Sequence, residues 1–290
     1  MPGLVCFCRL FRRLLLGLAV GILPVAAGSA AAQGDLLVAP TRVVIANAGA
    51  GEVVLSNIGT AAATYRIGLE LRRMTADGDI IDVAEDVSTA AERAALAMVH
   101  YAPRRITLQP GQPQAVRIAV RPPQDLPDGE YRVHMSFRAV PAAALEGDAQ
   151  HLDASAAASG VSIKLVPVYG ITIPVIVRKG ALVAAGTLTN PHVVRGERGA
   201  YLEVALVRSG QRSLYGEIIG KTARGAAIFN LKGVAIYPEV ANRMVRIPLT
   251  PAQLGKVAEG PIQIEYRELP ENGGQLIAAL TGPVRQGAPQ

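Results

Sequence analysis

The sequence has 290 residues, of which 50% are hydrophobic and 18% are charged, and its formal net charge is +6. These proportions exclude an intrinsically disordered chain, because disorder requires low hydrophobicity and a high net charge. The length allows two domains of ordinary size, and the 30 glycines and 20 prolines favour short strands with many turns over a helical bundle.

Residues 1–32 predict a signal peptide. Three arginines precede an apolar run over 14–25, and the small residues Ala30 to Ala32 offer a cleavage site before Gln33. The apolar run is shorter than the roughly 20 residues that a transmembrane helix needs. We therefore expect a mature chain that starts at about Gln33, is exported and is soluble. An uncleaved membrane anchor is the alternative.

The leader contains both cysteines of the chain, Cys6 and Cys8. The mature chain therefore has no disulfide, no cysteine metal site and no thiol nucleophile. Removing the three leader arginines from the net charge of +6 leaves +3. This charge is too small and too dispersed for a nucleic-acid-binding protein, which needs a basic stripe or patch.

Period-two alternation and turn signals dominate the mature chain and predict strands. In the first half, strands are expected at 36–45, 53–57, 63–71, 105–108, 115–120 and 130–140. The segments 105–108 and 115–120 flank a Pro-Gly turn and are expected to form a hairpin. The Ala-rich segment 82–98 is expected to be a loop with one helical turn, and 141–160 to be a mobile loop.

A long segment from Val161 to Arg178 carries apolar residues at its odd positions. They are Val161, Ile163, Leu165, Pro167, Tyr169, Ile171, Ile173, Val175 and Val177. Proteins normally avoid an exposed apolar edge strand, because it invites pairing with another chain. The residues alone leave two interpretations open, a buried central strand of a sandwich and a binding surface.

Seven further strands are expected after a linker that starts at Lys179-Gly180. They lie at 182–188, 201–207, 214–219, 227–236, 243–249, 262–266 and 275–280. About seven short strands in roughly 100 residues are typical of an immunoglobulin-like sandwich, and the first half has a similar number. We predict an all-β protein with two immunoglobulin-like domains, at 33–179 and 180–290.

No residue pattern indicates an enzyme. The four histidines are His100, His134, His151 and His192, and no two of them have the spacing of metal ligands. The acidic run over 77–86 lacks the glycine and the distal glutamate of a calcium loop. We expect neither a catalytic site nor a metal or cofactor, and an exported hydrolase is kept only as an outside alternative.

Three segments of the first half resemble the N-terminal domain of periplasmic pilus chaperones, the PapD-like family of the chaperone–usher pathway. They are Ala102–Gly111 (APRRITLQPG), Gln114–Arg117 (QAVR) and Leu126–His134 (LPDGEYRVH). Pro40–Arg42 (PTR) and Ile173–Arg178 (IPVIVR) support the resemblance. It covers roughly 36–180 and is weaker from 181 onward.

The resemblance implies two immunoglobulin-like domains set at an angle, with a cleft between them. It implies a chaperone that binds pilus subunits, or related surface subunits, by adding its own strand over 161–178 to the subunit's groove. The implied donor residues are Ile163, Leu165, Tyr169, Ile171, Ile173 and Val175. An outer-membrane usher is left open as a second partner. The alternative function is an exported immunoglobulin-like binding or structural protein with no role in assembly.

The resemblance also implies two basic residues that anchor the subunit's C-terminal carboxylate. The first matches Arg42. The position of the second, a lysine in the family, is occupied here by Pro174, and Lys164 lies about 33 Å away along an extended strand. Either another basic residue takes its place, Arg104 or Arg105 for example, or the anchoring differs.

A third implied feature is an ion network between the two domains. The resemblance assigns it to Glu130, Arg178 and Glu271. An arginine fork can bridge two carboxylates, and surface ion pairs contribute about 0–1 kcal/mol. The network is therefore expected to orient the domains more than to stabilise them.

Overall fold

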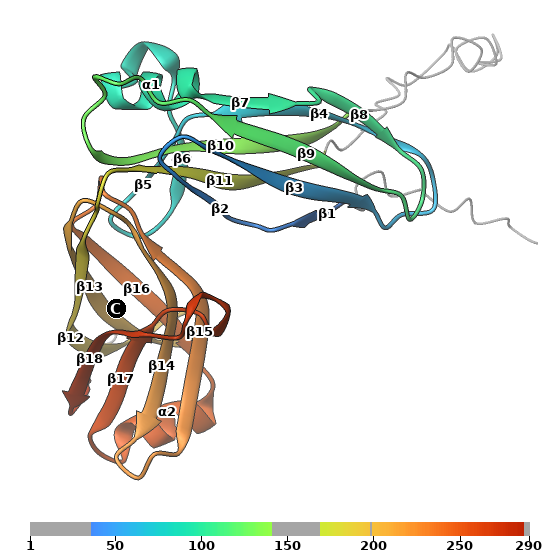
Figure 1. Cartoon of the computed structure of the whole chain (residues 1–290). Coiled ribbons are helices and arrows are strands. Elements are labelled where there is room, and N and C mark those ends of the chain that lie inside the picture. Colours follow the sequence, from blue (N-terminus) through green and yellow to red (C-terminus); the bar gives the residue numbers. More distant parts are fainter. Residues whose placement is uncertain (1–35, 141–168, 198, 287–290) are drawn as a thin grey trace, which may run out of the picture. The chain divides into compact units, whose positions relative to one another are not determined.

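The computed structural model of the chain describes residues 36–140, 169–197 and 199–286 (Figure 1). The fold of this part is all-β and consists of two immunoglobulin-like sandwiches. The first sandwich is built from a four-stranded sheet with the order β1-β3-β9-β7 and a five-stranded sheet with the order β2-β11-β10-β4-β8. The second is built from two four-stranded sheets, β16-β13-β12-β19 and β15-β14-β17-β18, and β5 and β6 form a separate two-stranded sheet.

The elements of the first sandwich precede Gly180 in the chain. Its strands are β1 (Leu36–Ala39), β2 (Val43–Ala46), β3 (Gly49–Asn57), β4 (Ala63–Glu70), β5 (Arg72–Met74), β6 (Ile80–Asp82), β7 (Val99–Ala102), β8 (Arg105–Leu108), β9 (Pro113–Val120), β10 (Gly129–Val140) and β11 (Gly170–Lys179). The 3-10 turn η1 (Glu85–Val87) and the helix α1 (Ala90–Met98) connect β6 to β7.

The elements of the second sandwich follow Gly180. Its strands are β12 (Ala184–Gly196), β13 (Gly199–Gly210), β14 (Leu214–Thr222), β15 (Ala227–Ile236), β16 (Asn242–Leu249), β17 (Ile262–Arg267), β18 (Leu276–Gly282) and β19 (Arg285–Gln286). Helix α2 (Pro251–Ala258) lies between β16 and β17, and the 3-10 turn η2 (Pro270–Asn272) lies between β17 and β18.

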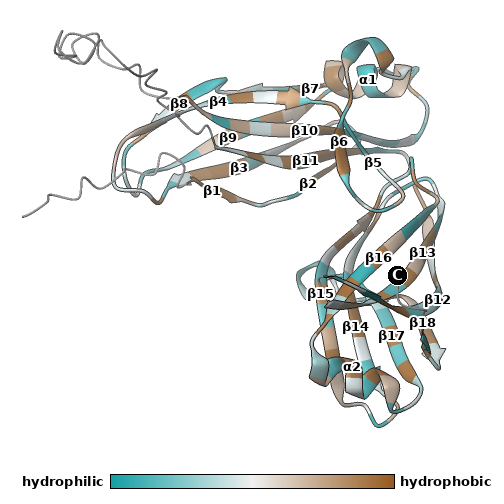
Figure 2. Ribbon diagram, turned by 180° about the vertical axis from the view of Figure 1, so that it is seen from behind, coloured by the Kyte–Doolittle hydropathy of each residue, from teal (hydrophilic) through white to brown (hydrophobic). Residues whose placement is uncertain are grey.

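Each sandwich has its own aliphatic core, because alternate residues of its strands point inward. The alternation of hydrophobic and hydrophilic residues is visible along β16 and β17 in Figure 2. Two residues of the first half, Met74 and Ile176, pack into the core of the second sandwich instead. The two sandwiches therefore share apolar contacts as well as polar ones.

The predicted single strand over 36–45 is wrong, since the chain forms two strands there in opposite sheets. β1 pairs with β3, and β2 pairs in parallel with β11. In β1 the even-numbered residues Leu36 and Val38 are buried, whereas in β2 the odd-numbered residues Val43 and Ile45 are buried. The alternation changes because the two strands reach the core from opposite sheets. Pro40 lies in the crossing, where its missing amide hydrogen takes no ladder bond away.

The predicted hairpin over 105–120 is also wrong. β8 pairs with β4, whereas β9 pairs with β3 and β7 in the opposite sheet. The connection is held by the buried side chain of Asn57, whose Nδ2 donates to the carbonyl of Leu108 (3.0 Å). The amide of Gly111 donates to the carbonyl of the same asparagine (2.7 Å). A Pro-Gly turn signal therefore marks a crossover between sheets here.

The segment over 82–98 contains more helix than the one turn predicted. Thr89 and Glu92 form a capping box at the start of α1, each side chain bonding the other's backbone. Ala95 and Met98 bury one face of the helix in the core of the first sandwich. A capping box formed by Thr250 and Gln253 also begins α2, a helix that the sequence analysis did not predict.

His134 is a buried titratable group on β10. It is only 4% exposed, and its Nδ1 has no hydrogen-bond partner among the described residues. Burial, with the nearby charges of Arg132 and Arg72, lowers its pKa from 6.5 to about 3. The imidazole therefore stays neutral in the folded chain at mildly acidic pH.

This shift predicts a loss of stability in acid. Below pH 6.5 the unfolded chain binds a proton at His134, whereas the folded chain does so only near pH 3, so stability is lost as the pH falls between these values. At pH 5 the loss should be about 2 kcal/mol, at roughly 1.4 kcal/mol per pH unit. Urea unfolding of His134→Gln should show a smaller loss between pH 7 and pH 5 than the wild-type chain. His100→Gln, at an exposed site on β7, is the control, and an equal loss in wild type and His134→Gln would contradict the assignment.

Candidate functional site

Arg42 lies where the chain has crossed between the two sheets of the first sandwich, one residue before β2. Its Nη1 donates to the hydroxyl of Tyr237 (3.1 Å) and its Nη2 to the hydroxyl of Ser213 (3.1 Å). Its guanidinium carbon is 4.5 Å from the ring centroid of Tyr215 and 5.6 Å from that of Tyr237. All these partners belong to the second sandwich, and all are neutral.

No carboxylate neutralises Arg42 within the part of the chain that the structure describes. Cation–π contacts and hydroxyl acceptors hold a guanidinium in place without cancelling its charge. A guanidinium can bind a carboxylate through two parallel hydrogen bonds. The half-buried Arg42 is therefore a preorganised cation that can bind an anionic group.

A cleft of about 710 Å³ opens beside Arg42. It is lined by residues next to and within β2 and β11 of the first sandwich, and by the segments 184–185, 212–215 and 268–277 of the second. Its charged lining residues are Arg42, Arg178, Arg212, Glu268 and Glu271. The cleft therefore contains charges of both signs, and neither of its two glutamates forms an ion pair with Arg42.

Arg178 and Glu130 form an ion pair at the base of this cleft. The Nε of Arg178 donates to Oε2 of Glu130 (2.9 Å), and the glutamate side chain is only 1% exposed. The same oxygen accepts from the backbone amide (3.1 Å) and the hydroxyl (2.9 Å) of Ser213 in the second sandwich. Three donors on Oε2 compensate for part of the hydration that burial removes, whereas Oε1 is buried with no hydrogen-bond partner among the described residues.

The predicted third member of this network, Glu271, is not part of it. Glu271 lines the cleft and is exposed, but it forms no ion pair with Arg178 among the described residues. Ser213 provides the contact from the second sandwich instead. The physical reason is that one carboxylate already satisfies the Arg178 Nε, and a serine supplies donors to that carboxylate without adding a second negative charge.

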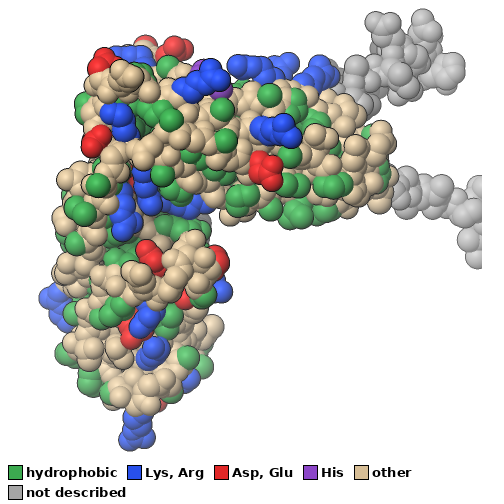
Figure 3. All heavy atoms as spheres, in the orientation of Figure 1, with side chains coloured by type: hydrophobic (Ala, Val, Ile, Leu, Met, Phe, Trp, Pro, Cys, Tyr) green, Lys and Arg blue, Asp and Glu red, His purple; other side chains and the backbone are tan. Residues whose placement is uncertain are grey.

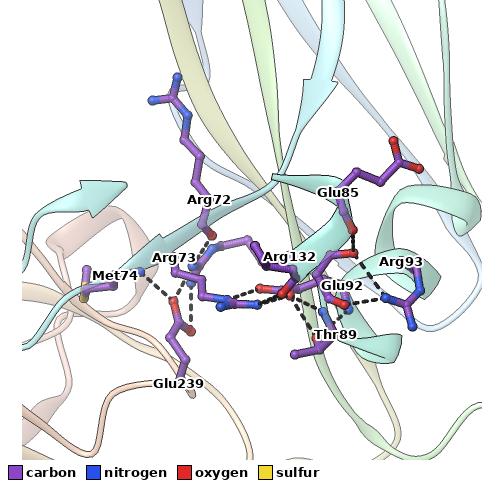
Figure 4. A network of polar contacts seen from close by, with 11 residues as sticks. Arg72, Arg73, Met74, Glu85, Thr89, Glu92, Arg93, Arg132 and Glu239 are labelled. Carbon is purple, nitrogen blue, oxygen red and sulfur yellow. Dashed lines mark hydrogen bonds and ion pairs between the residues drawn. The ribbon is translucent and has the colours of Figure 1, made fainter. Parts of the chain in front are cut away.

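A second polar junction was missed by the sequence analysis (Figure 4). Arg132 on β10 forms an ion pair with Glu239 of the second sandwich and lies 3.6 Å from the ring centroid of Tyr237. Glu239 Oε1 also accepts from the backbone amide of Met74 (2.9 Å), and Arg132 Nη2 donates to the carbonyl of Arg72 (3.0 Å). The sequence signal for this junction was the motif EYRVH. In it, Arg132 follows Glu130 on the same face of a strand.

The structure corrects part of the predicted donor stripe. Ile173 and Val175 are 2% and 0% exposed and lie in the core of the first sandwich, so a partner's groove cannot take them up in this conformation. Ile171 is half-buried against the same core, and Tyr169 is 54% exposed. Ile163 and Leu165, and the N-terminal half of the predicted strand, lie outside the described residues.

Among the residues that the structure describes, no strand pairs with one edge of β11 before Val175, and we call this part the open edge. β10 pairs with β11 over its whole length, whereas β2 pairs only with residues 175–178. The carbonyl of Tyr169 accepts from the amide of Ala139 (3.0 Å), so odd residues of β11 bond to β10 and even residues face the opposite side. The backbone groups of Gly170 and Thr172 therefore point to an unpaired edge.

Pro174 fits this edge. It faces His134 on β10, but as an even residue it directs its nitrogen to the open side, so the missing amide hydrogen costs the ladder nothing. Extending the register of Val175 with Val43 by one residue brings Arg42 level with Pro174. The open edge thus ends at the unneutralised cation.

The replacements suggested for the second anchor do not lie in the cleft. Arg104 is exposed and lies over the ring of Tyr101, at 4.9 Å from its centroid, and Arg105 is exposed on β8. Neither lines the cleft, whereas Arg212, which the sequence analysis did not single out, does. The described residues contain no group of three or more side chains that could hold a metal ion, and neither described helix could cross a membrane.

The chain was compared with family models, with curated proteins and with solved structures. No family model and no curated protein matches. The YadV chaperone is similar over 86% of this chain and 100% of its own, at 11% identity and a TM-score of 0.46. The Salmonella enterica SafB chaperone, solved with the SafA pilin, matches over 87% and 97%, at 15% identity and a TM-score of 0.44. The periplasmic chaperone SfaE matches over 86% and 100%, at 14% identity and a TM-score of 0.41. These are structures of the family whose motifs the sequence resembles.

The Glu130 ion pair predicts a measurable loss of stability. Glu130→Gln should keep the shape of the side chain but remove the charge that Arg178 and Ser213 bind, leaving a partly buried guanidinium without its counterion. We expect a loss of about 1–3 kcal/mol in the free energy of unfolding, measured by urea denaturation. Glu52→Gln, at an exposed position on β3, is the control and should change little, and an unchanged midpoint for Glu130→Gln would show that the pair contributes nothing.

Proposed function

We propose that this chain is a periplasmic chaperone that binds surface subunits, of pili or related appendages, by strand addition. The observation that carries this proposal is the open edge of β11, which ends at the cation of Arg42. An unpaired edge can pair with an extended segment of another protein. A cation at the end of that edge selects a segment that terminates in a carboxylate.

The direction of the added segment follows from β2. Because β2 runs parallel to β11 and begins just beyond Arg42, a subunit strand in line with β2 would also run parallel to β11. Its last residue would then lie next to Arg42, so its C-terminal carboxylate would meet the guanidinium. The backbone groups of Gly170 and Thr172 would supply the ladder hydrogen bonds, and Arg42 would fix the register.

Binding of this kind needs no bond-breaking step and no cofactor, so we propose a non-enzymatic role. A charge-assisted hydrogen bond contributes roughly 1.5–3 kcal/mol, and more is lost when the partner carboxylate is left buried and unpaired. The ladder pairs the edge of the subunit that would otherwise be free to aggregate. The guanidinium of Arg42, which only neutral groups contact, supports an anionic terminus over a neutral one.

Arg42→Ala tests the carboxylate site. We expect the variant to fold and its yield of co-purified subunit from the periplasmic fraction to fall by about tenfold or more, since 1.4 kcal/mol corresponds to a factor of ten. A subunit encoded beside the chaperone gene is the client to co-express. Arg117→Ala, on an exposed face of β9 away from the cleft, should leave the yield unchanged. A normal yield with Arg42→Ala would favour a binding or structural protein without an assembly role.

Thr172→Pro tests the open edge separately. Thr172 directs its amide away from β10, so proline there removes a hydrogen bond to an incoming strand but none within the chaperone. The variant should keep its circular dichroism spectrum and its unfolding midpoint to within a small shift, yet lose the subunit. Pro174→Thr restores an amide at the same edge and should bind at least as well as wild type. A Thr172→Pro chain that still captures its subunit would rule out pairing at this edge.

A further inference from the structure

Three arginines stand side by side on the outer face of the five-stranded sheet of the first sandwich. Arg138 on β10 lies opposite Arg66 on β4, and Arg66 lies opposite Arg105 on β8. Residues directly opposite each other in antiparallel strands have side chains on the same face, with Cβ atoms about 4.5–5.5 Å apart. All three side chains are exposed. We call Arg66, Arg105 and Arg138 the arginine row.

Among the described residues, the charge of the arginine row is cancelled only in part. Arg138 forms an ion pair with Glu70, but Glu70 is shared with Arg72. Arg66 and Arg105 have no ion pair or side-chain hydrogen bond among the described residues. Figure 3 shows Lys and Arg side chains gathered along the border of the first sandwich where Figure 1 places β7 and β8. Like charges directly opposite each other destabilise a sheet, so this arrangement lowers stability unless an anion binds.

The arginine row is distinct from the cleft beside Arg42. On β11, the residue directly opposite Arg138 of the row is Gly170. Gly170 and Arg178 are eight residues apart on β11, which is about 26 Å along an extended strand. A carboxylate bound at Arg42 therefore does not neutralise the arginine row.

We propose that the arginine row binds an acidic segment of a partner protein. The three guanidinium groups span about 10 Å, since neighbouring strands lie roughly 4.8 Å apart. Guanidinium groups bind carboxylates through paired hydrogen bonds, so the fitting partner presents two or three Asp or Glu side chains within that span. The hydroxyls of Thr64 and Thr107, which bond each other beside the row (2.8 Å), offer further polar contacts.

The surroundings favour protein carboxylates over lipid phosphates. Binding to a membrane surface needs buried apolar area as well as positive charge. The large apolar residues that are exposed in the described part of the chain include none from β4, β8 or β10. Beside the row on β4 and β10 lie Gly68 and Ser136, which are small or polar. A flat polar face with unpaired arginines is therefore suited to an acidic polypeptide.

A labelled decaglutamate peptide is the probe, and its fluorescence anisotropy measures binding to the full mature chain. The affinity should fall at least tenfold in Arg66→Glu/Arg105→Glu, and raising the salt concentration should weaken wild-type binding. Arg195→Glu/Arg224→Glu carries the same change of net charge at exposed positions of the second sandwich and should bind within twofold of wild type. A decaglutamine peptide should not bind.

Equal losses in the two double variants, or no loss in either, would overturn the proposal, because net charge alone would then account for binding. Binding to phosphatidylglycerol vesicles but not to decaglutamate, lost in Arg66→Glu/Arg105→Glu, would replace the acidic segment by a lipid surface. The variant Arg66→Gln/Arg105→Gln distinguishes a loss of binding from a loss of the fold. It removes like charges from the sheet, so it should unfold no earlier than wild type while still losing the peptide.

Discussion

The crossing of the first segment between the two sheets of the first sandwich is the constraint on which the binding site depends. Because β1 pairs with β3 and β2 pairs with β11 only from Val175 onward, no other described strand lies beside that edge of β11 before residue 175. The same crossing places Arg42 at the end of that free edge. A single strand over 36–45 would have covered the edge and directed the arginine elsewhere.

The cation at this point keeps its charge because its partners are aromatic rings and hydroxyls. Tyr215 and Tyr237 contribute their faces, and Ser213 contributes its oxygen. An acidic partner would have held Arg42 as firmly but would have removed its capacity to bind an anion. Glu130 accepts a hydrogen bond from Ser213, but its charge is paired with Arg178 and not with Arg42. The hydroxyl oxygen of Ser213 thus accepts from both arginines, of which Arg178 is neutralised by Glu130 and Arg42 is not.

Apolar and polar contacts join the two sandwiches together. Met74 and Ile176 leave the first half to pack in the second core, while Arg132 and Glu239 form an ion pair beside them. Charged groups buried without partners are costly, and the Arg132–Glu239 and Arg178–Glu130 pairs reduce that cost at this junction. The arginine row lies far from the junction and lacks such compensation, which is why the two sets of arginines suit different roles.

The sequence by itself determined, through the resemblance of its motifs, that Arg42, Glu130 and Arg178 were candidate site residues. Its alternation of residues determined where most strands lie and which residues share a face. Period-two patterns carry that information, because side-chain alternation is a local property of the backbone. They do not say which strands pair. The hairpin over 105–120 was wrong for this reason, since its two strands lie in opposite sheets.

Only the tertiary structure decided which side of β11 is open and which residues line the cleft. An apolar alternation over 169–177 is the same whether it faces its own core or a partner, and burial of Ile173 and Val175 settled it for these two residues. Ser213, Tyr215, Tyr237 and Arg212 lie at least 170 residues after Arg42, in strands of the second sandwich or in the turns beside them. Their place beside Arg42 depends on how the sandwiches pack, and no local pattern in the chain encodes that contact.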